Sequence, residues 1–487
     1  MKRYERHADA MAQLIHNGTL RPGDRMPSVR EASRARGISP STVFAAYYLL
    51  EAQGLVHSRP RSGYYVSARL PAALQARPPE PLPSPPQRGS TGVAISDLVF
   101  EVLGSARDRD LVPLGSAFPG LELFPLERLA RCLSIGMRQL DPWTIVNSLS
   151  PGNARLRQQI ALRYRLHGVA VEPDEIILTN GALEALNLCL EAVVQPGDTV
   201  VVESPTFYAA LQALERLQLQ ALEVATHPRD GIDLDALAQA LAQHPVRACW
   251  LMPSFQNPLG SLMPTGKKRE LVALLERHQV PLIEDDVYGE LHFAPHRPPP
   301  AKAFDGAGRV MHCSSFSKCL APGYRVGWVA AGQYAPRVQR LKLMTTLSAA
   351  IPSQQALSEY LAQGGYDRHL RQLRRSLAQQ QALALAAIDQ HFPRGTRVSR
   401  PEGGYFVWVE LPAQVDALAL HRLALQQGIS LAPGQIFSAD QRFAHSVRIN
   451  YGHPAQADFA QALHTVGAIA CRLAGQVPRP PAISPAP

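Results

Sequence analysis

A stretch dominated by proline and small polar residues interrupts the chain between Pro71 and Gly92, where the sequence reads PAALQARPPEPLPSPPQRGSTG. Such a composition cannot build a hydrophobic core and favours extended polyproline conformation. The sequence therefore predicts a linker over residues 69–94 that separates a small unit, residues 1–68, from a large unit, residues 95–475. The final GQVPRPPAISPAP is similarly rich in proline, and we expect residues 476–487 to form a disordered tail.

The 487 residues suffice for at least two domains, and a hydrophobic share of 46% with a charged share of 18% is typical of a soluble globular protein. No apolar run reaches the roughly 18 residues of a membrane span, and the start MKRYERH lacks the apolar core of a secretory signal. We therefore expect a cytoplasmic protein with no membrane partner. Six scattered cysteines without a C-x-x-C pair or a histidine cluster indicate reduced structural thiols and no metal site: Cys132, Cys189, Cys249, Cys313, Cys319 and Cys471.

The positive charge is concentrated in the small unit. Residues 1–70 contain eleven Lys and Arg and five Asp and Glu, a net charge of +6, so the other 417 residues carry only +3 of the total of +9. A basic small domain is suited to a polyanion such as nucleic acid, although a basic surface can also be merely solvated.

The small unit contains two adjacent helix signals. In MPSVREASRARG, Ser28 can cap a helix, Glu31 completes a capping box, and Gly37 ends the helix. A second helix begins at once, with Ser39 as cap and Pro40 at its first position, and its apolar residues recur at i, i+3, i+4 and i+7: Val43, Ala46, Tyr47 and Leu50. Of the neighbouring Tyr47 and Tyr48, we expect one in the core and one on the surface. LVHS and YYV then flank RPRSG, which indicates a β-hairpin with arginines at its tip.

Two helices, a tight turn and a basic hairpin predict a winged helix-turn-helix, and the alternative is a small helical bundle without a ligand. The stretches GTLRPGDRMPSVREAS, STVFAAYYLLEAQGLV and RPRSGYYV resemble the GntR family. That resemblance implies binding to double-stranded promoter DNA, and phosphate or base contacts suit these residue types. This sequence departs from many relatives in the second helix, where Phe44, Ala45 and Ala46 stand at positions at which a basic or polar residue is common. We therefore expect few base contacts from this helix. The implied DNA-binding residues are Arg30, Ser41, Thr42, Arg59, Arg61 and Gly63.

The large unit alternates strand-like runs such as EIILT, TVVVE and VPLIED with helical patterns such as NGALEALNLCLEAVV. This alternation predicts an α/β fold, a sheet covered by helices. Ligands of such sheets bind at the carboxyl ends of the strands, so the residues that follow each strand are the candidate site.

A lysine with anion-binding neighbours follows one of these strands. In SSFSKCLAPGYRVGW, Lys318 is flanked by Ser315 and Ser317, and Arg325 lies seven residues on. The amine can form a Schiff base with an aldehyde cofactor, while the hydroxyls and the guanidinium can hold its phosphate. By itself the pattern is weak, because lysine next to serine is common on exposed turns.

Polar residues also follow two other strands. Asp285 ends the strand in PLIEDDVYGEL, where a carboxylate can pair with a pyridinium nitrogen, and Tyr288 can reach a ring hydroxyl. Asn257 in MPSFQNPLG can donate to the same ring oxygen. The structural alternatives are a helix cap for Asp285, a packed ring for Tyr288 and a plain Asn-Pro turn for Asn257.

Two further segments complete the candidate site. In TNGALEAL, a strand passes through Gly181 into a helix whose first amides, those of Ala182 and Leu183, can bind phosphate. In ESPTFY, Phe207 is placed to stack on a ring, although packing in the core is the commoner fate of a single phenylalanine.

Together these motifs resemble the class I/II aminotransferases, fold-type-I enzymes with pyridoxal 5'-phosphate (PLP), over residues 110–470. The resemblance implies that Lys318 forms the aldimine, that Asp285 pairs with the pyridine nitrogen, and that Phe207 stacks on the ring. It further implies contacts of Asn257 and Tyr288 with the ring oxygen and a phosphate site at Ala182, Leu183, Ser315, Ser317 and Arg325. Arg448 in SVRINYG would bind a substrate carboxylate, unless it is only a surface arginine at a strand end.

A GntR-like head, a proline-rich linker and an aminotransferase-like body resemble the MocR subfamily of bacterial regulators. The resemblance implies a head-to-tail homodimer with each cofactor at the subunit interface. In VNSLSPGNARLR, Asn147 and Ser148 stand where aminotransferases usually place a tyrosine that reaches the partner's phosphate, and Tyr164 is a candidate replacement.

The sequence leaves three functions open. The first is a regulator that senses PLP, an amino acid or an amine, which the basic head and the linker favour. The second is a working aminotransferase that also binds DNA, with Lys318, Asp285 and Tyr288 as its catalytic residues. The third is regulation with a vestigial PLP site. It predicts that the catalytic residues have been lost, whereas the sequence retains all of them.

Overall fold

The computed structural model describes residues 3–16, 19–20, 23–52, 55–59, 62–66, 78–85, 89–104, 111–453 and 457–477. The chain folds as two compact units, residues 1–76 and 77–487. Within the described ranges, no helix has the length and apolarity that crossing a bilayer requires.

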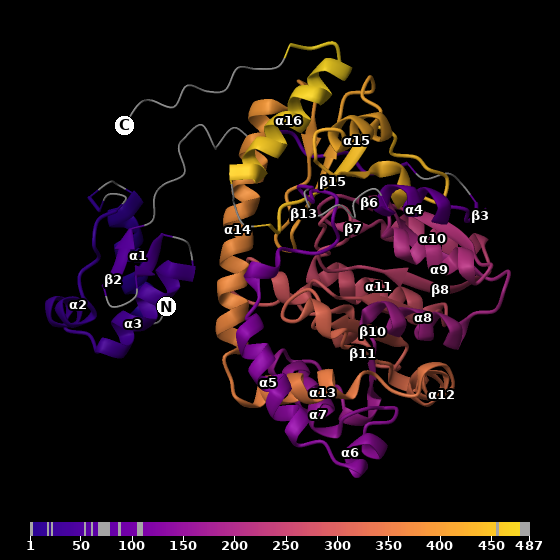
Figure 1. Ribbon diagram of the computed structural model, residues 1–487, viewed down its shortest axis with the longest axis horizontal. Helices are drawn as coiled ribbons and strands as arrows, with labels where there is room; N and C mark the ends of the chain where they lie inside the picture. The colour runs from indigo at the N-terminus through magenta and orange to yellow at the C-terminus, as the bar shows by residue number, and fades with distance from the viewer. Residues whose placement is uncertain are drawn as a thin grey trace. The chain divides into compact units, whose positions relative to one another are not determined.

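The small unit contains three helices, α1 (Arg3–His16), α2 (Val29–Arg36) and α3 (Pro40–Ala52), and a hairpin of β1 (Val56–Arg59) and β2 (Gly63–Val66) (Figure 1). The hairpin is antiparallel, with Arg59 opposite Gly63. The α2–turn–α3 arrangement followed by this wing confirms the predicted winged helix-turn-helix. The sequence patterns above did not predict α1, which supplies Ala8, Met11 and Ile15 to the core of the unit.

Local signals set the bounds of α2 and α3 as predicted. Ser28 and Glu31 form a reciprocal capping box, and Gly37 ends α2 in the left-handed conformation. The predicted apolar stripe of α3 is fully buried, and the Tyr47 hydroxyl donates to the Pro27 carbonyl over 2.9 Å. Tyr48 lies on the surface, which confirms the expected division between the two tyrosines.

Residues 78–85 of the predicted linker lie against the large unit. The backbone amide of Val398 donates to the carbonyl of Pro79 over 2.9 Å, and Arg229 pairs with Glu80 over 2.6 Å. Ser84 donates to the carbonyl of Ser204 over 2.5 Å. Further on, β3 (Thr91–Gly92) pairs with the edge of the large sheet. Residues 69–77 and 86–88 of the predicted linker, and residues 478–487 of the predicted tail, are outside the described residues.

The large unit is built on a mixed sheet with the strand order β3-β6-β5-β8-β9-β10-β11-β4, to which β7 adds beside β6. Neighbours from β6 to β10 run parallel, whereas β11 is antiparallel to both β10 and β4. The strands are β4 (Ile176–Thr179), β5 (Thr199–Ser204), β6 (Gln220–His227), β7 (Gly231–Ile232), β8 (Val246–Leu251), β9 (Leu282–Asp285), β10 (Val310–Ser315) and β11 (Gly327–Ala330).

Helices cover both faces of this sheet because its central strands are apolar on both sides. On β5, Val200 and Val202 pack in one cluster with α8 and α9, whereas Val201 packs in another with α10 and α11. The helices are α4 (Ser96–Gly104), α5 (Leu126–Arg138), α6 (Pro142–Asn147), α7 (Ala154–Leu166), α8 (Ala182–Val193), α9 (Tyr208–Arg216), α10 (Leu234–Gln243), α11 (Thr265–Arg277), α12 (Ala335–Thr346), α13 (Ile351–Ala362), α14 (Tyr366–His391), α15 (Ala417–Leu425) and α16 (Ala457–Leu473).

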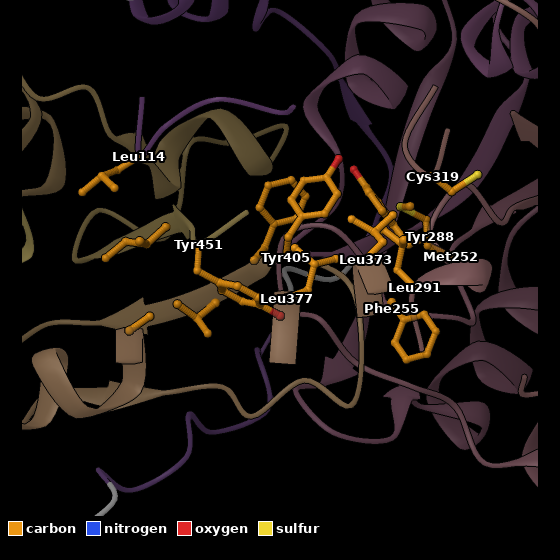
Figure 2. Packing of buried hydrophobic residues seen from close by; sticks show 14 of the residues in the cluster. Leu114, Met252, Phe255, Tyr288, Leu291, Cys319, Leu373, Leu377, Tyr405 and Tyr451 are labelled. Atoms are coloured by element: carbon orange, nitrogen blue, oxygen red, sulfur yellow. The ribbon is translucent and has the colours of Figure 1, made fainter. Parts of the chain in front are cut away.

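A second sheet forms the C-terminal part, in the order β12 (Arg397–Val398), β13 (Phe406–Glu410), β15 (Ser446–Asn450) and β14 (Ala432–Pro433). The long helix α14 packs along α16 beside it (Figure 1). One apolar cluster joins this part to the edge of the large sheet, and Figure 2 shows Tyr405 between Tyr451 on one side and Tyr288 on the other. The candidate site lies where these two parts meet.

Candidate functional site

Residues from five different strand ends make up the candidate site, as the sequence predicts. Because β4, β5, β6, β8, β9 and β10 run in one direction, their carboxyl ends share one edge of the sheet. Phe207 follows β5, Asn257 follows β8, Asp285 ends β9, Lys318 follows β10, and Ala182 begins α8 after β4.

Lys318 is half-buried and does not lie on an exposed turn. Its Nζ atom donates to the carbonyl oxygen of Ala117 over 2.7 Å and lies 3.7 Å from the ring centroid of Phe118. Desolvation, with the positive charges of Arg448 and Arg325 nearby, lowers the pKa of Lys318 to about 7, while Asp285 acts in the opposite sense. A large fraction of neutral amine at neutral pH suits addition to an aldehyde.

Asp285 is buried, and its Oδ1 atom has no hydrogen-bond partner among the described residues. Burial, with the charge of the adjacent Asp286, raises the pKa of Asp285 to about 7. A buried acceptor without a donor is costly unless a ligand completes it. The pyridine N–H of PLP is such a donor, so this carboxylate fits the cofactor that the sequence predicts.

Asn257 connects two other predicted residues. Its amide nitrogen lies 3.4 Å from the Tyr288 hydroxyl, and its Oδ1 accepts a hydrogen bond of 3.0 Å from Arg448. Tyr288 is buried with its ring edge-on to the rings of Tyr405 and Phe406. Asn257 therefore links Tyr288 to Arg448 at the candidate site, and the packed ring that was the alternative for Tyr288 coexists with this contact.

Arg448 is fully buried on β15, so it is not a surface arginine. Besides Asn257, it donates to the carbonyls of Gly115 and Ser116 over 2.7 and 3.2 Å, and the Phe406 ring lies 4.2 Å from its guanidinium carbon. Among the described residues no carboxylate pairs with it. A buried guanidinium that bonds only neutral acceptors is suited to a carboxylate ligand.

The residues of the predicted phosphate site lie near one another at the start of α8. Arg325 donates to Ser317 over 3.5 Å and to the carbonyl of Asn180 over 3.2 Å, while Ser315 accepts from the amide of Ser317. A Cβ atom at Gly181, where φ is +86°, would collide with the Arg325 guanidinium. The guanidinium thus lies beside the first turn of α8, where the amides of Ala182 and Leu183 have no intrahelical partner.

Residues 115–118 also belong to the site, and no sequence pattern predicted them. Their carbonyls accept hydrogen bonds from Arg448, Lys318, Asn450 and the Tyr405 hydroxyl, which contacts Ala117 over 3.0 Å. A backbone carbonyl can accept a hydrogen bond whatever the side chain of its residue. The sequence therefore does not mark this segment, and only the fold reveals it.

Tyr164 does not replace the tyrosine that the sequence lacks near residue 148. Its side chain is buried, and its hydroxyl shares a hydrogen bond of 2.7 Å with His312 and accepts one of 3.0 Å from Trp328. All three residues belong to the large unit, and Tyr164 and His312 are buried in its interior, so this hydroxyl is enclosed and not exposed at the surface. Ser148 is buried as well, whereas Asn147 is exposed.

In the small unit, Arg30 is exposed on α2, and Ser41 and Thr42 lie in the first turn of α3. The Ser39 hydroxyl contacts the hydroxyls of Ser41 and Thr42 over 2.9 and 2.8 Å. Gly63 begins β2 opposite Arg59, with φ of +105°. The side chain of Arg59 and the whole of Arg61 are outside the described residues.

A helix-covered mixed sheet with a lysine after β10, a buried carboxylate at the end of β9 and an arginine beside the first turn of α8 defines the class of PLP-dependent proteins with the aminotransferase fold. Residues 145–465 match the family of class I and II aminotransferases, and residues 3–66 match the gntR family of bacterial regulatory proteins.

The chain is 49% identical over 450 residues to the HTH-type transcriptional regulator YdcR of Escherichia coli, covering 92% of this chain and 95% of that protein. It is 37% identical to the regulator YjiR of the same organism, with coverage of 96% and 98%. Among solved structures, α-aminoadipate aminotransferase LysN of Thermus thermophilus, complexed with N-(5'-phosphopyridoxyl)-L-leucine, matches with a TM-score of 0.70 and 28% identity, covering 79% of this chain and all of that one.

The chain therefore belongs to the GntR-type transcription regulators that carry a class I/II aminotransferase domain, the MocR subfamily. Its cofactor is PLP.

Proposed function

We propose that this regulator uses its PLP site to sense PLP, an amino acid or an amine, and that the bound ligand changes its occupancy of a promoter. The observation that carries the proposal is that the buried guanidinium of Arg448 has no carboxylate partner among the described residues. It donates a hydrogen bond to Asn257. A carboxylate ligand would complete its hydrogen bonding, as an amino acid can.

Each side chain of the site has a role in this proposal. Bound PLP supplies an aldehyde carbon for an amine and a ring that withdraws electrons from it. Asp285 would hold the positive charge of the ring nitrogen, and Lys318 would carry the cofactor and accept a proton from the ligand's Cα. Tyr288 and Asn257 would orient the ring oxygen, Phe207 would pack on the ring face, and Arg325 with the first turn of α8 would bind the phosphate.

The small unit would bind double-stranded promoter DNA in the cytoplasm. Arg30, Ser41 and Thr42 lie on α2 and α3, Arg59 pairs with Gly63 in the hairpin, and Arg61 stands between these two in the sequence. Two arginines at a wing tip suit phosphates or the minor groove. For sensing to regulate, the ligand must bind two arrangements of the protein with different affinity.

We also propose a head-to-tail homodimer, which would present two heads to two half-sites. Trp143, Ile145 and Val146 on α6 are between 54% and 71% exposed, and Leu347 is 60% exposed. The amide of Ser150 donates to the carbonyl of Leu347 over 3.1 Å, so the segment that follows α6 contacts the residue that follows α12. Contiguous apolar surface favours a protein partner. A molar mass of one chain in sedimentation equilibrium would argue against the dimer.

The sensing proposal is tested by the visible spectrum of the PLP-loaded protein, titrated with the twenty amino acids and a set of primary amines and followed by a keto-acid assay. We expect one ligand class to shift the absorbance lastingly, without pyridoxamine phosphate, and Lys318→Ala to lose the cofactor absorbance. No ligand-dependent shift from any compound would overturn sensing of amino acids and amines.

A second candidate is a working aminotransferase, which the lowered pKa of Lys318 favours because a neutral amine can move protons near neutral pH. In the same titration, stoichiometric pyridoxamine phosphate and catalytic keto-acid release would support this function.

A further inference from the structure

Helix α3 presents a second apolar stripe on its exposed side. Phe44, Ala45 and Tyr48 recur at i, i+1 and i+4, with the polar Ser41 about one turn before them, offset from the buried stripe that holds the helix to its unit. Phe44 is 54% exposed and Tyr48 is 39% exposed. Together with Val29 and Pro40, they line a shallow open hollow on this side of the helix.

The apolar stripe lies in basic surroundings. The side chains of Arg25, Arg30, Arg34 and Arg36 are exposed on α2 and the segment before it. From Pro40 to Leu50, however, α3 contains no charged residue. The surrounding charge is complementary to a polyanion, while the helix itself has no Arg or Lys for guanine and no Asn or Gln for adenine.

The Phe44 ring is supported from the wing. Its ring is edge-on to that of Tyr64 on β2, with centroids 6.5 Å apart, and Tyr64 is in turn edge-on to the buried Tyr47, at 5.4 Å. Tyr47 is fixed by its hydrogen bond to Pro27. An exposed ring backed by two others is already ordered before binding, so a contact that it makes costs little conformational entropy.

In the major groove, the C5 methyl of thymine is the apolar group that a base presents, and Phe and Ala side chains are suited to contact it. We propose that Phe44, with Ala45, recognises thymine methyl groups in the promoter site and thereby determines which base pairs α3 selects. This inference rests on the proposed promoter binding by α3 and specifies its chemistry. The helix would recognise bases through apolar contacts, while the surrounding arginines would bind the phosphates.

The test uses the full-length PLP-loaded protein and DNA that it selects from a pool of random duplexes. In the selected duplex, each thymine is replaced in turn by deoxyuridine, which removes only the methyl group, and affinity is measured by fluorescence anisotropy. We expect one or two positions at which the replacement weakens binding about fourfold per methyl. Phe44→Ala should bind the thymine duplex more weakly by a similar factor and respond to deoxyuridine at those positions by less than about twofold.

Phe100→Ala is the matched control, because Phe100 is an exposed phenylalanine on α4 of the large unit, 66% exposed. It should retain the full preference for thymine. If the wild type binds selected DNA but tolerates deoxyuridine everywhere, methyl recognition is wrong while promoter binding stands. If no duplex is enriched or bound, promoter binding itself fails. If Phe44→Ala changes only the molar mass of the free protein, the stripe contacts a second copy and the inference is overturned.

Discussion

The Nη1 atom of Arg448 donates a hydrogen bond of 3.0 Å to the Oδ1 atom of Asn257, a residue 191 positions earlier in the chain. The same asparagine lies 3.4 Å from the Tyr288 hydroxyl. The group expected to bind a ligand carboxylate is therefore linked, through one amide, to a group expected to bind the cofactor ring. We therefore expect that a ligand at either position changes the hydrogen bonding available at the other.

Asn257→Asp should weaken amino-acid binding by roughly 10- to 100-fold, because a carboxylate beside Arg448 competes with that of the ligand. Amino-acid affinity is read from the visible absorbance of the PLP-loaded protein. Asn257→Ser, which adds no charge, is the matched control and should lose less. Equal losses in the two variants would count against competition for Arg448.

Arg448→Lys should separate ligands by their carboxylate. Lysine retains the charge but not the two parallel donors, so the affinity for phenylalanine should fall by about tenfold or more. Phenethylamine lacks the α-carboxylate and should bind with unchanged affinity. The measurement is the same absorbance titration on both compounds. A parallel loss for both would indicate damage to the cofactor site, not loss of a carboxylate clamp.

The rate of PLP attachment should depend on pH with a midpoint near 7. Desolvation and neighbouring guanidinium groups lower the pKa of Lys318 to about 7. The fraction of Lys318 in the reactive neutral form therefore increases with pH, and nearly all of it is neutral well above that value. Stopped-flow absorbance of the apo-protein should show a rate that rises about tenfold per pH unit below the midpoint and then levels off. An Nα-acetyl-lysine control in the same buffers corrects for the titration of PLP, and a protein rate still rising beyond about pH 9 would contradict the environment described for Lys318.

Replacing Arg59 and Arg61 with alanine should weaken DNA binding and flatten its dependence on salt. Each lost phosphate contact reduces the slope of log K against log salt by about 0.9, because fewer counterions are released. The control carries Arg277→Ala and Arg394→Ala, exposed arginines of the large unit that change the net charge equally. A slope identical in the two double variants would exclude the wing from the DNA site.

Much of the fold follows from local patterns in the sequence. The capping box at Ser28, the buried stripe of α3 and the strands that precede Asp285 and Lys318 each depend on residues close in the chain. Helix α1 has a comparable apolar spacing at Ala8, Met11 and Ile15, so the sequence also contains a periodic signal for this helix.

Other features depend on contacts between residues far apart in the chain, which cannot be predicted from local patterns in a single sequence. The carbonyls of residues 115–118 reach Lys318 and Arg448 across more than 200 and 300 residues. Tyr164 was a candidate for a subunit contact, yet it is enclosed by His312 and Trp328, 148 and 164 residues away. Whether such a hydroxyl faces a partner or the core depends on packing, not on the motif around it.

The central claim, that the PLP site biases promoter occupancy, is tested most directly by the DNA affinity of the full-length PLP-loaded protein at fixed salt. Fluorescence anisotropy on a selected duplex, with and without the compound that shifts the visible spectrum, should give affinities that differ about 5- to 150-fold, the usual range of coupling between two sites. Arg448→Lys should require more of an amino-acid ligand for the same effect. If the compound saturates the PLP site and the affinity for DNA does not change, the two units are not coupled and the sensor account is wrong.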